Sequence, residues 1–522
     1  MKDFKIPAFC EVDFTDHQEN ATARVVTIPH AKDADFAAYD AYFLDYGFAK
    51  KECYTEGAHL FAAYQKGTLG VFLNYYGGTR ELRVVTEENC LYFDYVDAVL
   101  PSKTTPQITQ ISLEDFGLSY VIRLSDGRFI VIDGGRNFEP DQDKLLACLE
   151  KGVNGEKPVI AAWLISHPHS DHFHCFLGFM ERYADRVTIE KFMLNFPEAD
   201  DLVHYPKLAN SEDAQQDTSG VTQIPRMLAL IKQTGAPTYM LHTGQRYKIG
   251  DADCEVLSTM DDTIHVSDNI NASSVVLRME LGGQVILWTT DASFSITKLP
   301  ERYGTYLKSD ILQIPHHGFQ SGTAKGEIAG YDMVEPETCL LSVANYHAFV
   351  SFCTYREGTR HVMCKSSVQE VIAGTKQRTL TLPYHPSPDA KNALMREYLM
   401  GRDSCGTYSY IFSDLNTANE EDFVFTLLNT TYLPATVRVD LYFEDKAQAV
   451  ENIVATVPGR SLKKLSLLGD EVKTETAFYN LNSLQKKGIP ENTLFGVRFI
   501  SDLPIVVTHK THQAAYHSST NL

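Results

Sequence analysis

The sequence predicts an α+β protein with three folded parts, and three observations lead to this. The chain has 522 residues, which is long for one domain. Short apolar strands alternate with helix-like segments over about 110–385, whereas strand patterns without a convincing helix follow from about 407. We therefore expect a small α+β domain over 1–105, a layered central domain over 106–390 and an all-β sandwich over 405–522.

Composition and charge exclude several classes of protein. Hydrophobic residues make up 44% and charged residues 22%, which is ordinary for a globular chain. The 47 basic against 67 acidic residues give a net charge of −20, so nucleic acid is not favoured as a partner. We find neither a signal-peptide pattern nor an apolar run of about 18 residues, so we expect a cytoplasmic protein with no membrane partner.

In the N-terminal part, one helix and an antiparallel meander are predicted. The helix begins near Asp33, because aromatic side chains then recur at helical spacing up to Tyr46. Three strand-like runs follow at 59–64, 70–75 and 81–85, separated by turns that contain glycine. Nothing in this part indicates chemistry.

The central part has the pattern of sheets covered by helices. A hairpin is predicted from strands 120–124 and 129–132, which flank a Ser-Asp-Gly turn. The apolar run 159–165 is typical of a strand buried on both faces. Helices are predicted over 171–183 and 221–234. We expect a layered fold with helices outside the sheets.

The chemical signal begins directly after the strand 159–165. The residues there are Ser-His-Pro-His-Ser-Asp-His, which place His167, His169, Asp171 and His172 within six positions. A single histidine is more often a structural residue than a ligand, but four ligand-type residues at a strand end reverse that expectation. Alternate residues of extended backbone project to one side, so His167 and His169 can bind the same cation.

Three other strands end in residues of the same kind. Asp133 ends the strand in Ile-Val-Ile-Asp-Gly-Gly, Asp291 follows Ile-Leu-Trp-Thr-Thr, and His316 and His317 follow Ile-Leu-Gln-Ile-Pro. Acidic and imidazole groups at several strand ends can converge on one rim of a sheet. Imidazole and carboxylate ligands suit zinc, and also manganese or iron.

These motifs carry a family resemblance. The HxHxDH motif, with IDGG upstream and TTD and PHHG downstream, resembles the metallo-β-lactamase-fold hydrolases. Within them it is most similar to the branch of competence-type DNA-uptake proteins and phosphorylcholine esterases, because Asn-Ala-Ser-Ser-Val-Val-Leu at 271–277 resembles that branch's Asn-rich segment. The resemblance covers about 280 residues and implies a central αββα sandwich.

The resemblance also implies roles for individual residues. His167 and His169 would bind a first ion, Asp171 and His172 a second, and Asp291 would bridge them. Either His316 or His317 would complete the second site, and the other would lie near the substrate. Asp133 would orient the metal loop by accepting hydrogen bonds. The implied cofactor is one or two zinc ions, with manganese or iron as alternatives.

The chain departs from the family at the third ligand of the first site. Many members have a histidine where Asn269 to Asn271 align here. His242 and His265 are alternatives, as are Asn271 itself and a single bound ion.

Three further residues are weaker candidates for the pocket. His174 is expected to pack or to support a ligand, and Asn195 to line the pocket or cap a loop. Arg136 is expected either to hold an anionic substrate or to be solvated.

The predicted activity is metal-assisted hydrolysis by a metal-bound hydroxide. Asp171 would align the hydroxide, and the histidine of the His316–His317 pair that is not a ligand would protonate the leaving group. A phosphodiester or another phosphate ester is the expected small-molecule substrate. The alternative is a catalytically weak or inactive metallo-β-lactamase-fold protein whose C-terminal sandwich serves binding or assembly.

The C-terminal part resembles the sensory rhodopsin transducer family over about 110 residues. The resemblance depends on the strand pattern of 425–431, 437–445 and 500–507 and on a few turn residues. That family is a small β-sandwich that tends to self-associate, so the resemblance implies a homo-oligomer formed through this part.

Overall fold

The computed structural model describes most of the chain, and the statements below concern those residues. They are 15–18, 23–115, 117–153, 155–195, 223–263, 270–319, 322–343, 357–374, 376–387, 408–431, 435–444, 450–467, 492–501, 505–510 and 515–518. The chain divides into two compact units, Met1–Ala390 and Lys391–Leu522. None of the described helices has both the length and the apolar character needed to cross a membrane.

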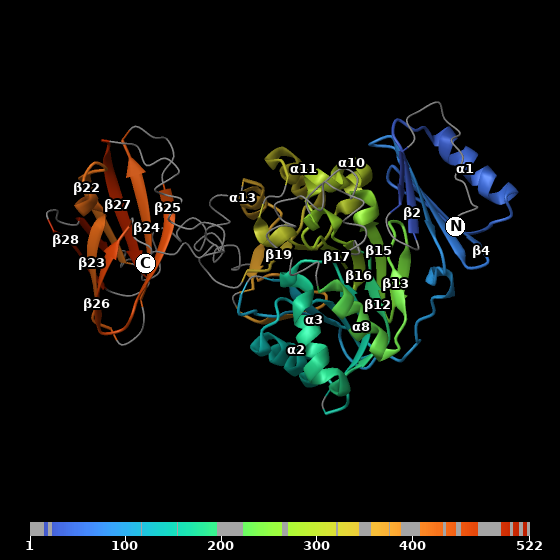
Figure 1. The fold of residues 1–522 in the computed structure, drawn as a ribbon, viewed down its shortest axis with the longest axis horizontal. Helices are drawn as coiled ribbons and strands as arrows, with labels where there is room; N and C mark the ends of the chain where they lie inside the picture. Colours follow the sequence, from blue (N-terminus) through green and yellow to red (C-terminus); the bar gives the residue numbers. More distant parts are fainter. Residues whose placement is uncertain are drawn as a thin grey trace. The chain divides into compact units, whose positions relative to one another are not determined.

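The first sheet has six antiparallel strands in the order β1-β2-β6-β5-β4-β3. They are β1 (Thr15–Gln18), β2 (Ala23–Ile28), β3 (Ala49–Glu56), β4 (His59–Lys66), β5 (Leu69–Tyr76) and β6 (Glu81–Glu87). Helix α1 (Asp33–Asp45) lies on one face of this sheet (Figure 1). Its Tyr39 and Phe43 belong to the hydrophobic core on that face. The opposite face contributes Phe61, Phe72 and Val85 to the core of the central sheets.

The next layer is an eight-stranded sheet in the order β13-β12-β10-β9-β8-β7-β21, with β11 beside β10. Its strands are β7 (Gln107–Gln110), β8 (Ser119–Arg123), β9 (Phe129–Asp133), β10 (Val159–Ile165), β11 (Thr188–Ile189), β12 (Phe192–Leu194), β13 (Thr238–Met240) and β21 (Arg378–Thr381). Its outer face is covered by α2 (Glu139–Lys151), α3 (Ser170–Tyr183) and α8 (Ile224–Thr234). The predicted hairpin is formed by β8 and β9, which pair antiparallel. The predicted buried strand is β10, which is apolar on both faces.

A second central sheet of seven strands has the order β14 to β20. Its strands are β14 (Arg246–Ile249), β15 (Ala252–Ser258), β16 (Val276–Leu281), β17 (Gln284–Trp288), β18 (Ile311–Gln313), β19 (Thr338–Leu341) and β20 (Glu370–Ala373). Its helices are α9 (Phe294–Thr297), α10 (Leu299–Tyr303), α11 (Ala324–Val334) and α13 (Glu357–Cys364). Short 3-10 turns are η1 (Tyr92–Asp94), η2 (Ala184–Arg186), η3 (Met260–Asp262), η4 (Ile270–Ser273), η5 (Gly304–Leu307) and η6 (Pro315–Gly318).

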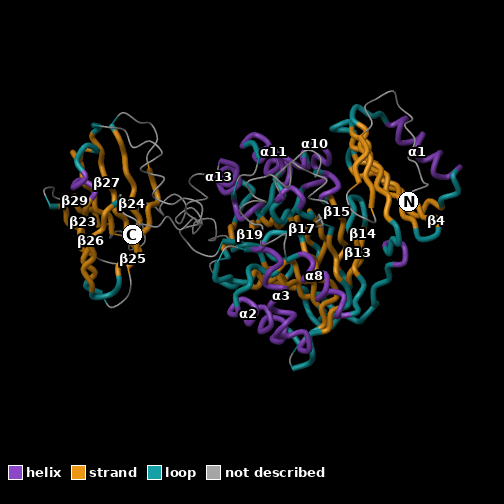
Figure 2. Tube along the Cα trace, in the orientation of Figure 1, coloured by secondary structure: helices purple, strands orange, loops and turns teal. Residues whose placement is uncertain are grey.

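The two central sheets stack with helices on their outer sides, as Figure 2 shows in purple around orange strands. One hydrophobic core lies between the sheets and contains Ile130, Leu277 and Trp288, while a second lies under α2 and α3 and contains Trp163 and Phe176. The predicted αββα arrangement is therefore confirmed.

The unit of residues 391–522 contains two antiparallel sheets, β25-β24-β27-β22-β29 and β26-β23-β28. The strands are β22 (Tyr408–Asn416), β23 (Val424–Asn429), β24 (Ala435–Phe443), β25 (Val450–Val457), β26 (Ser461–Ser466), β27 (Leu494–Ser501), β28 (Ile505–His509) and β29 (Ala515–Ser518), with the turn η7 (Glu420–Phe423). Alternate side chains of β24, such as Val437 and Val439, enter one shared core. The predicted all-β sandwich is confirmed for the described residues.

Candidate metal centre

The candidate site lies where four central strands end. β9 ends at Asp133, β10 leads into His167, β17 leads to Asp291 and β18 leads to His316. β9 and β10 are parallel neighbours in one sheet, and β17 and β18 are parallel neighbours in the other, so each pair of ends meets at one edge. We call the side chains gathered here the strand-tip cluster. Its members are His167, His169, Asp171, His172, Asn271, Asp291, His316 and His317.

The backbone of the loops at these strand ends is strained. Asp133, Thr290, His316 and His317 have φ values of 54°, 48°, 48° and 53°, in the left-handed region that costs a non-glycine residue on the order of 1 kcal/mol. Such conformations persist where the surrounding structure requires one side-chain direction. Here they occur together at the ends of β9, β17 and β18, beside the strand-tip cluster.

A first group of ligand atoms surrounds His167. Its Nε2 lies 3.1 Å from His169 Nδ1 and 3.2 Å from Asn271 Oδ1. Asp291 Oδ2 is 3.7 Å from the same nitrogen. Two imidazole nitrogens, an amide oxygen and a carboxylate oxygen therefore meet at one point.

A second group of ligand atoms surrounds His317 and His172. His317 Nε2 lies 3.3 Å from Asp171 Oδ2 and 3.5 Å from Asp291 Oδ2. His172 Nε2 lies 3.1 Å from the same Asp291 oxygen. Asp291 Oδ2 therefore joins both groups, which is the position of a bridging carboxylate.

Asp133 and Ser166 support the imidazoles from behind. Asp133 Oδ2 accepts hydrogen bonds from His172 Nδ1 and from the Ser166 hydroxyl, both at 2.7 Å, and its Oδ1 accepts the Ser166 backbone N–H. The Ser166 hydroxyl also lies 3.0 Å from His167 Nδ1. Binding Nδ1 in this way directs Nε2 of each ring towards the ligand groups.

Two supporting residues were missed by the sequence reasoning. Ser342 accepts a hydrogen bond from His317 Nδ1 through its backbone carbonyl, at 2.9 Å. Ser166 had one available signal, because it directly precedes the HxHxDH motif. Ser342 had none, since a backbone carbonyl acts there independently of side-chain identity.

Electrostatics in the strand-tip cluster favour ionised carboxylates beside two protonated imidazoles, those of His172 and His317, when no metal competes. Burial alone lowers the pKa of His172 and His317, but neighbouring carboxylates, chiefly Asp291, raise that of His172 well above its usual value and that of His317 to about 9. Burial raises the pKa of Asp291, yet the imidazoles lower it well below its ordinary value. A divalent cation can replace these protons without leaving the carboxylates unbalanced.

The side chains present fit a divalent cation. Asp291 Oδ1 is buried and makes no hydrogen bond within the part of the chain that the structure describes. Leaving such an atom unsatisfied costs about 1–3 kcal/mol, which a bound cation would offset. The ion pairs of the strand-tip cluster join only histidines with aspartates among the described residues. Nitrogen and oxygen donors of this kind suit zinc, manganese or iron.

The structure distinguishes His316 from His317, which the sequence left open. The side chain of His317 is 1% exposed and lies in the second group, whereas that of His316 is 22% exposed. His316 Nε2 lies 3.0 Å from Asn271 Nδ2 and 3.9 Å from Asp291 Oδ2. His317 is therefore the candidate ligand, and His316 faces the solvent side of the site.

The third member of the first group is Asn271. His242 does not take this place, because its Nδ1 is 2.5 Å from Asp261 Oδ2 and its Nε2 is 3.4 Å from Glu87 Oε2. His265, the other alternative from sequence, lies outside the described residues. An amide oxygen thus stands where many family members are expected to have imidazole.

The weaker candidates occupy different surroundings. The ring of His174 packs edge-on against that of Phe173, with centroids 4.7 Å apart. Asn195 donates to the Leu241 carbonyl at 2.7 Å and to Asp261 at 2.9 Å, so it belongs to the surroundings of His242. Arg136 donates to the Ser170 hydroxyl at 3.2 Å, directly beside Asp171.

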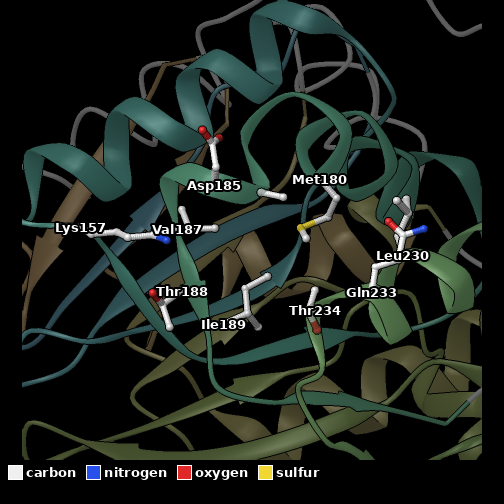
Figure 3. Close-up of a pocket in the computed structure, with 10 residues that line it drawn as sticks. Lys157, Met180, Asp185, Val187, Thr188, Ile189, Leu230, Gln233 and Thr234 are labelled. Carbon is white, nitrogen blue, oxygen red and sulfur yellow. The ribbon is translucent and has the colours of Figure 1, made fainter.

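A cavity of about 470 Å³ lies at the C-terminal end of α3. Figure 3 shows the residues that line it. Met180 and Asp185 line it, together with Thr188 of β11 and Leu230 of α8. The strand-tip cluster adjoins the first turn of α3, whereas this cavity adjoins its last turn. The cavity is therefore separate from the candidate metal centre.

Comparison with protein families supports the same interpretation of the central part. The model of the metallo-beta-lactamase superfamily matches residues 113–324. The central domain has the metallo-beta-lactamase fold. Members of this superfamily are typically metal-dependent hydrolases, and the fold implies a divalent metal. The search of curated proteins finds no match.

Several solved structures are similar to parts of the chain. CmlA, a diiron beta-hydroxylase from Streptomyces venezuelae, is 13% identical with a TM-score of 0.35, covering 54% of this chain and 55% of CmlA. The flavodiiron protein from Giardia intestinalis is 12% identical with a TM-score of 0.23, covering 57% and 59%. The Anabaena sensory rhodopsin transducer is 23% identical with a TM-score of 0.15, covering 19% of this chain and 94% of the transducer. The chain thus spans somewhat over half the length of the two diiron proteins.

Proposed function

We propose that the central domain is a metal-dependent hydrolase whose substrate is a phosphodiester or another small phosphate ester. One observation carries the proposal: five imidazole and carboxylate side chains from the ends of β10, β17 and β18 gather around Asp291 Oδ2. The residues that would hold a first ion are His167, His169, Asn271 and Asp291. Those that would hold a second are Asp171, His172, His317 and Asp291.

A bound divalent cation supplies Lewis acidity, which acidifies water and stabilises negative charge on an attacked phosphorus or carbonyl centre. The chain's own residues do the rest. Asp171 is 16% exposed on its side chain, so its Oδ1 can accept a hydrogen bond from water and orient it while Oδ2 stays near His317. The pKa of His316 is lowered by burial to about 4, so its ring is neutral near pH 7 and can hydrogen-bond a substrate oxygen.

Charge at the edge of the site supports a phosphate ester in particular. Arg136 lies beside Ser170, the residue before Asp171; its side chain is 36% exposed, and its Nε lies 3.7 Å from Asp115 Oδ2 at the surface. A guanidinium in this position can pair with a phosphate oxygen through two hydrogen bonds. Hydrolysis would then break one P–O ester bond, form another from water and place the proton of water on the leaving oxygen.

The test uses the full-length chain, before and after metal is removed with a chelator. We expect bound metal at purification and turnover of bis-p-nitrophenyl phosphate that is lost on chelation and restored by Zn²⁺ or Mn²⁺. The variant His317→Ala should reduce turnover by on the order of 100-fold, since a ligand is removed. The matched control is His385→Ala, because His385 is exposed and pairs with Glu337.

Other outcomes separate the alternatives. Absence of both bound metal and metal-stimulated turnover contradicts the hydrolase and favours the inactive, binding alternative. Turnover of a lactone or thioester without turnover of any phosphate ester contradicts the substrate class alone.

A further inference from the structure

Two hydrogen bonds fix the chain just after Asn271. Asn271 lies on the short turn η4, and the chain directly after that turn is fixed to the metal loop because Val275 N–H donates to the Ser166 carbonyl at 3.2 Å. Closer to Asn271, the Thr263 hydroxyl donates to the carbonyl of the next residue, Ala272, at 2.6 Å. Thr263 is 1% exposed, so this hydrogen bond is shielded from water.

Thr263 directly follows Asp262, which is the centre of a buried set of contacts. Asp262 Oδ2 accepts the Thr259 backbone N–H at 2.9 Å, and Oδ1 pairs with Arg302 Nη1 at 3.1 Å and with Arg83. We call this set the Asp262 network. It comprises Tyr76, Arg83, Thr243, Thr259, Asp262 and Arg302.

The N-terminal sheet supplies part of this support. Arg83 lies on β6, is 0% exposed and contacts Asp262 directly. Glu87, at the end of the same strand, lies 3.4 Å from His242 Nε2, and His242 in turn holds Asp261. One strand of the N-terminal sheet therefore fixes two consecutive aspartates, and the next residue along the chain is Thr263.

We propose that Arg83 and Thr263 are positioning residues. Through them the N-terminal sheet places the amide oxygen of Asn271 in the first group of ligand atoms, around His167. The proposal rests on the proposed function. An amide oxygen is a neutral ligand and binds a cation less strongly than a carboxylate, so its contribution depends on being held in place. Supporting contacts behind ligands typically change metal affinity by about 10- to 100-fold.

The experiment is calorimetric titration of Zn²⁺ into the metal-depleted full chain. We expect two ions of unequal affinity in the natural protein, the weaker one in the first group. Thr263→Val should weaken that ion about tenfold and leave the tighter ion within twofold. Thr263→Ser keeps the hydroxyl and should retain both affinities, while Asn271→Ala should reproduce the loss.

A second variant tests the sheet and guards against loss of folding. Arg83→Lys keeps the positive charge beside Asp262 but loses the guanidinium geometry. We expect a two- to fivefold loss for the weaker ion and no change for the tighter one. Unchanged Zn²⁺ affinities in Thr263→Val overturn the proposal. If Arg83→Lys lowers the thermal stability but leaves both Zn²⁺ affinities unchanged, the N-terminal sheet does not position Asn271.

Three results for the natural protein and the serine variant complete the test. A single bound ion in the natural protein overturns the positioning proposal and leaves the proposed function standing. No bound ion contradicts both. Equal losses in Thr263→Val and Thr263→Ser show that the hydroxyl is not what matters and overturn the proposal.

Discussion

Asp262 and Asp291 are both buried aspartates, 2% and 1% exposed, yet their surroundings differ in one respect. Asp262 meets the guanidinium groups of Arg83 and Arg302, whereas the ion pairs that the structure describes for Asp291 are all with histidines. Arginine remains charged at any ordinary pH, so the Asp262 network is neutralised permanently. Imidazole can release its proton and bind a cation, so the strand-tip cluster can exchange protons for metal.

The largest effect should come from removing the carboxylate that joins the imidazoles. Asp291 Oδ2 lies within 3.9 Å of a nitrogen of His167, His172, His316 and His317. Asp291→Asn should abolish tight metal binding and reduce turnover by on the order of 10³-fold. Metal analysis and the phosphodiester assay measure these two losses. Retained metal in the variant would show that Asp291 does not bridge the two groups.

The equivalent change in the Asp262 network should act on stability. Asp262→Asn removes one of the two carboxylates that Arg83 and Arg302 share and leaves Glu81 as the other, which costs about 1–3 kcal/mol of folding free energy. Denaturant unfolding of the metal-depleted chain measures the loss. If Asp262→Asn were as stable as the natural protein, the arginines around Asp262 would not need its charge. The contrast drawn with Asp291 and its histidines would then be wrong.

The third comparison is a pH dependence of stability at His242. Burial lowers the pKa of His242, but Asp261 and Glu87 outweigh it and raise the value to about 10. Because the unfolded value is about 6.5, the stabilisation is complete below about pH 6.5 and is lost as the pH rises towards 10. The midpoint temperatures of thermal unfolding of the natural protein and of His242→Gln should therefore converge as the pH rises across this range. A constant difference between them would show that the charge of His242 does not contribute.

Much of the fold could be predicted from local pattern. β10 follows from its apolar run, and α3 from the helical signal that begins beside Asp171. β3 was missed because it is an edge strand whose side chains are mostly exposed and polar. β2 was missed although its residues are mainly buried, since it precedes α1 and pairs with β6, far along the chain.

The candidate site shows the same division. The four residues of the HxHxDH motif were predictable, because their spacing at a strand end needs no knowledge of distant residues. Asn195 was expected to line the pocket or to cap a loop, and in the structure it donates to the Leu241 carbonyl and to Asp261. Its position after β12 indicated a strand end without indicating which cluster that end approaches.

The sequence by itself determined which residues have metal-binding chemistry and at which strand ends they lie. Only the tertiary structure decided that His317 enters the second ligand group, that Asn271 meets His167, and that the N-terminal sheet reaches Asp262. The physical reason is that residue type and short spacing are local properties. Convergence instead depends on how two sheets stack and on left-handed backbone angles at their strand ends, which distant parts of the chain impose.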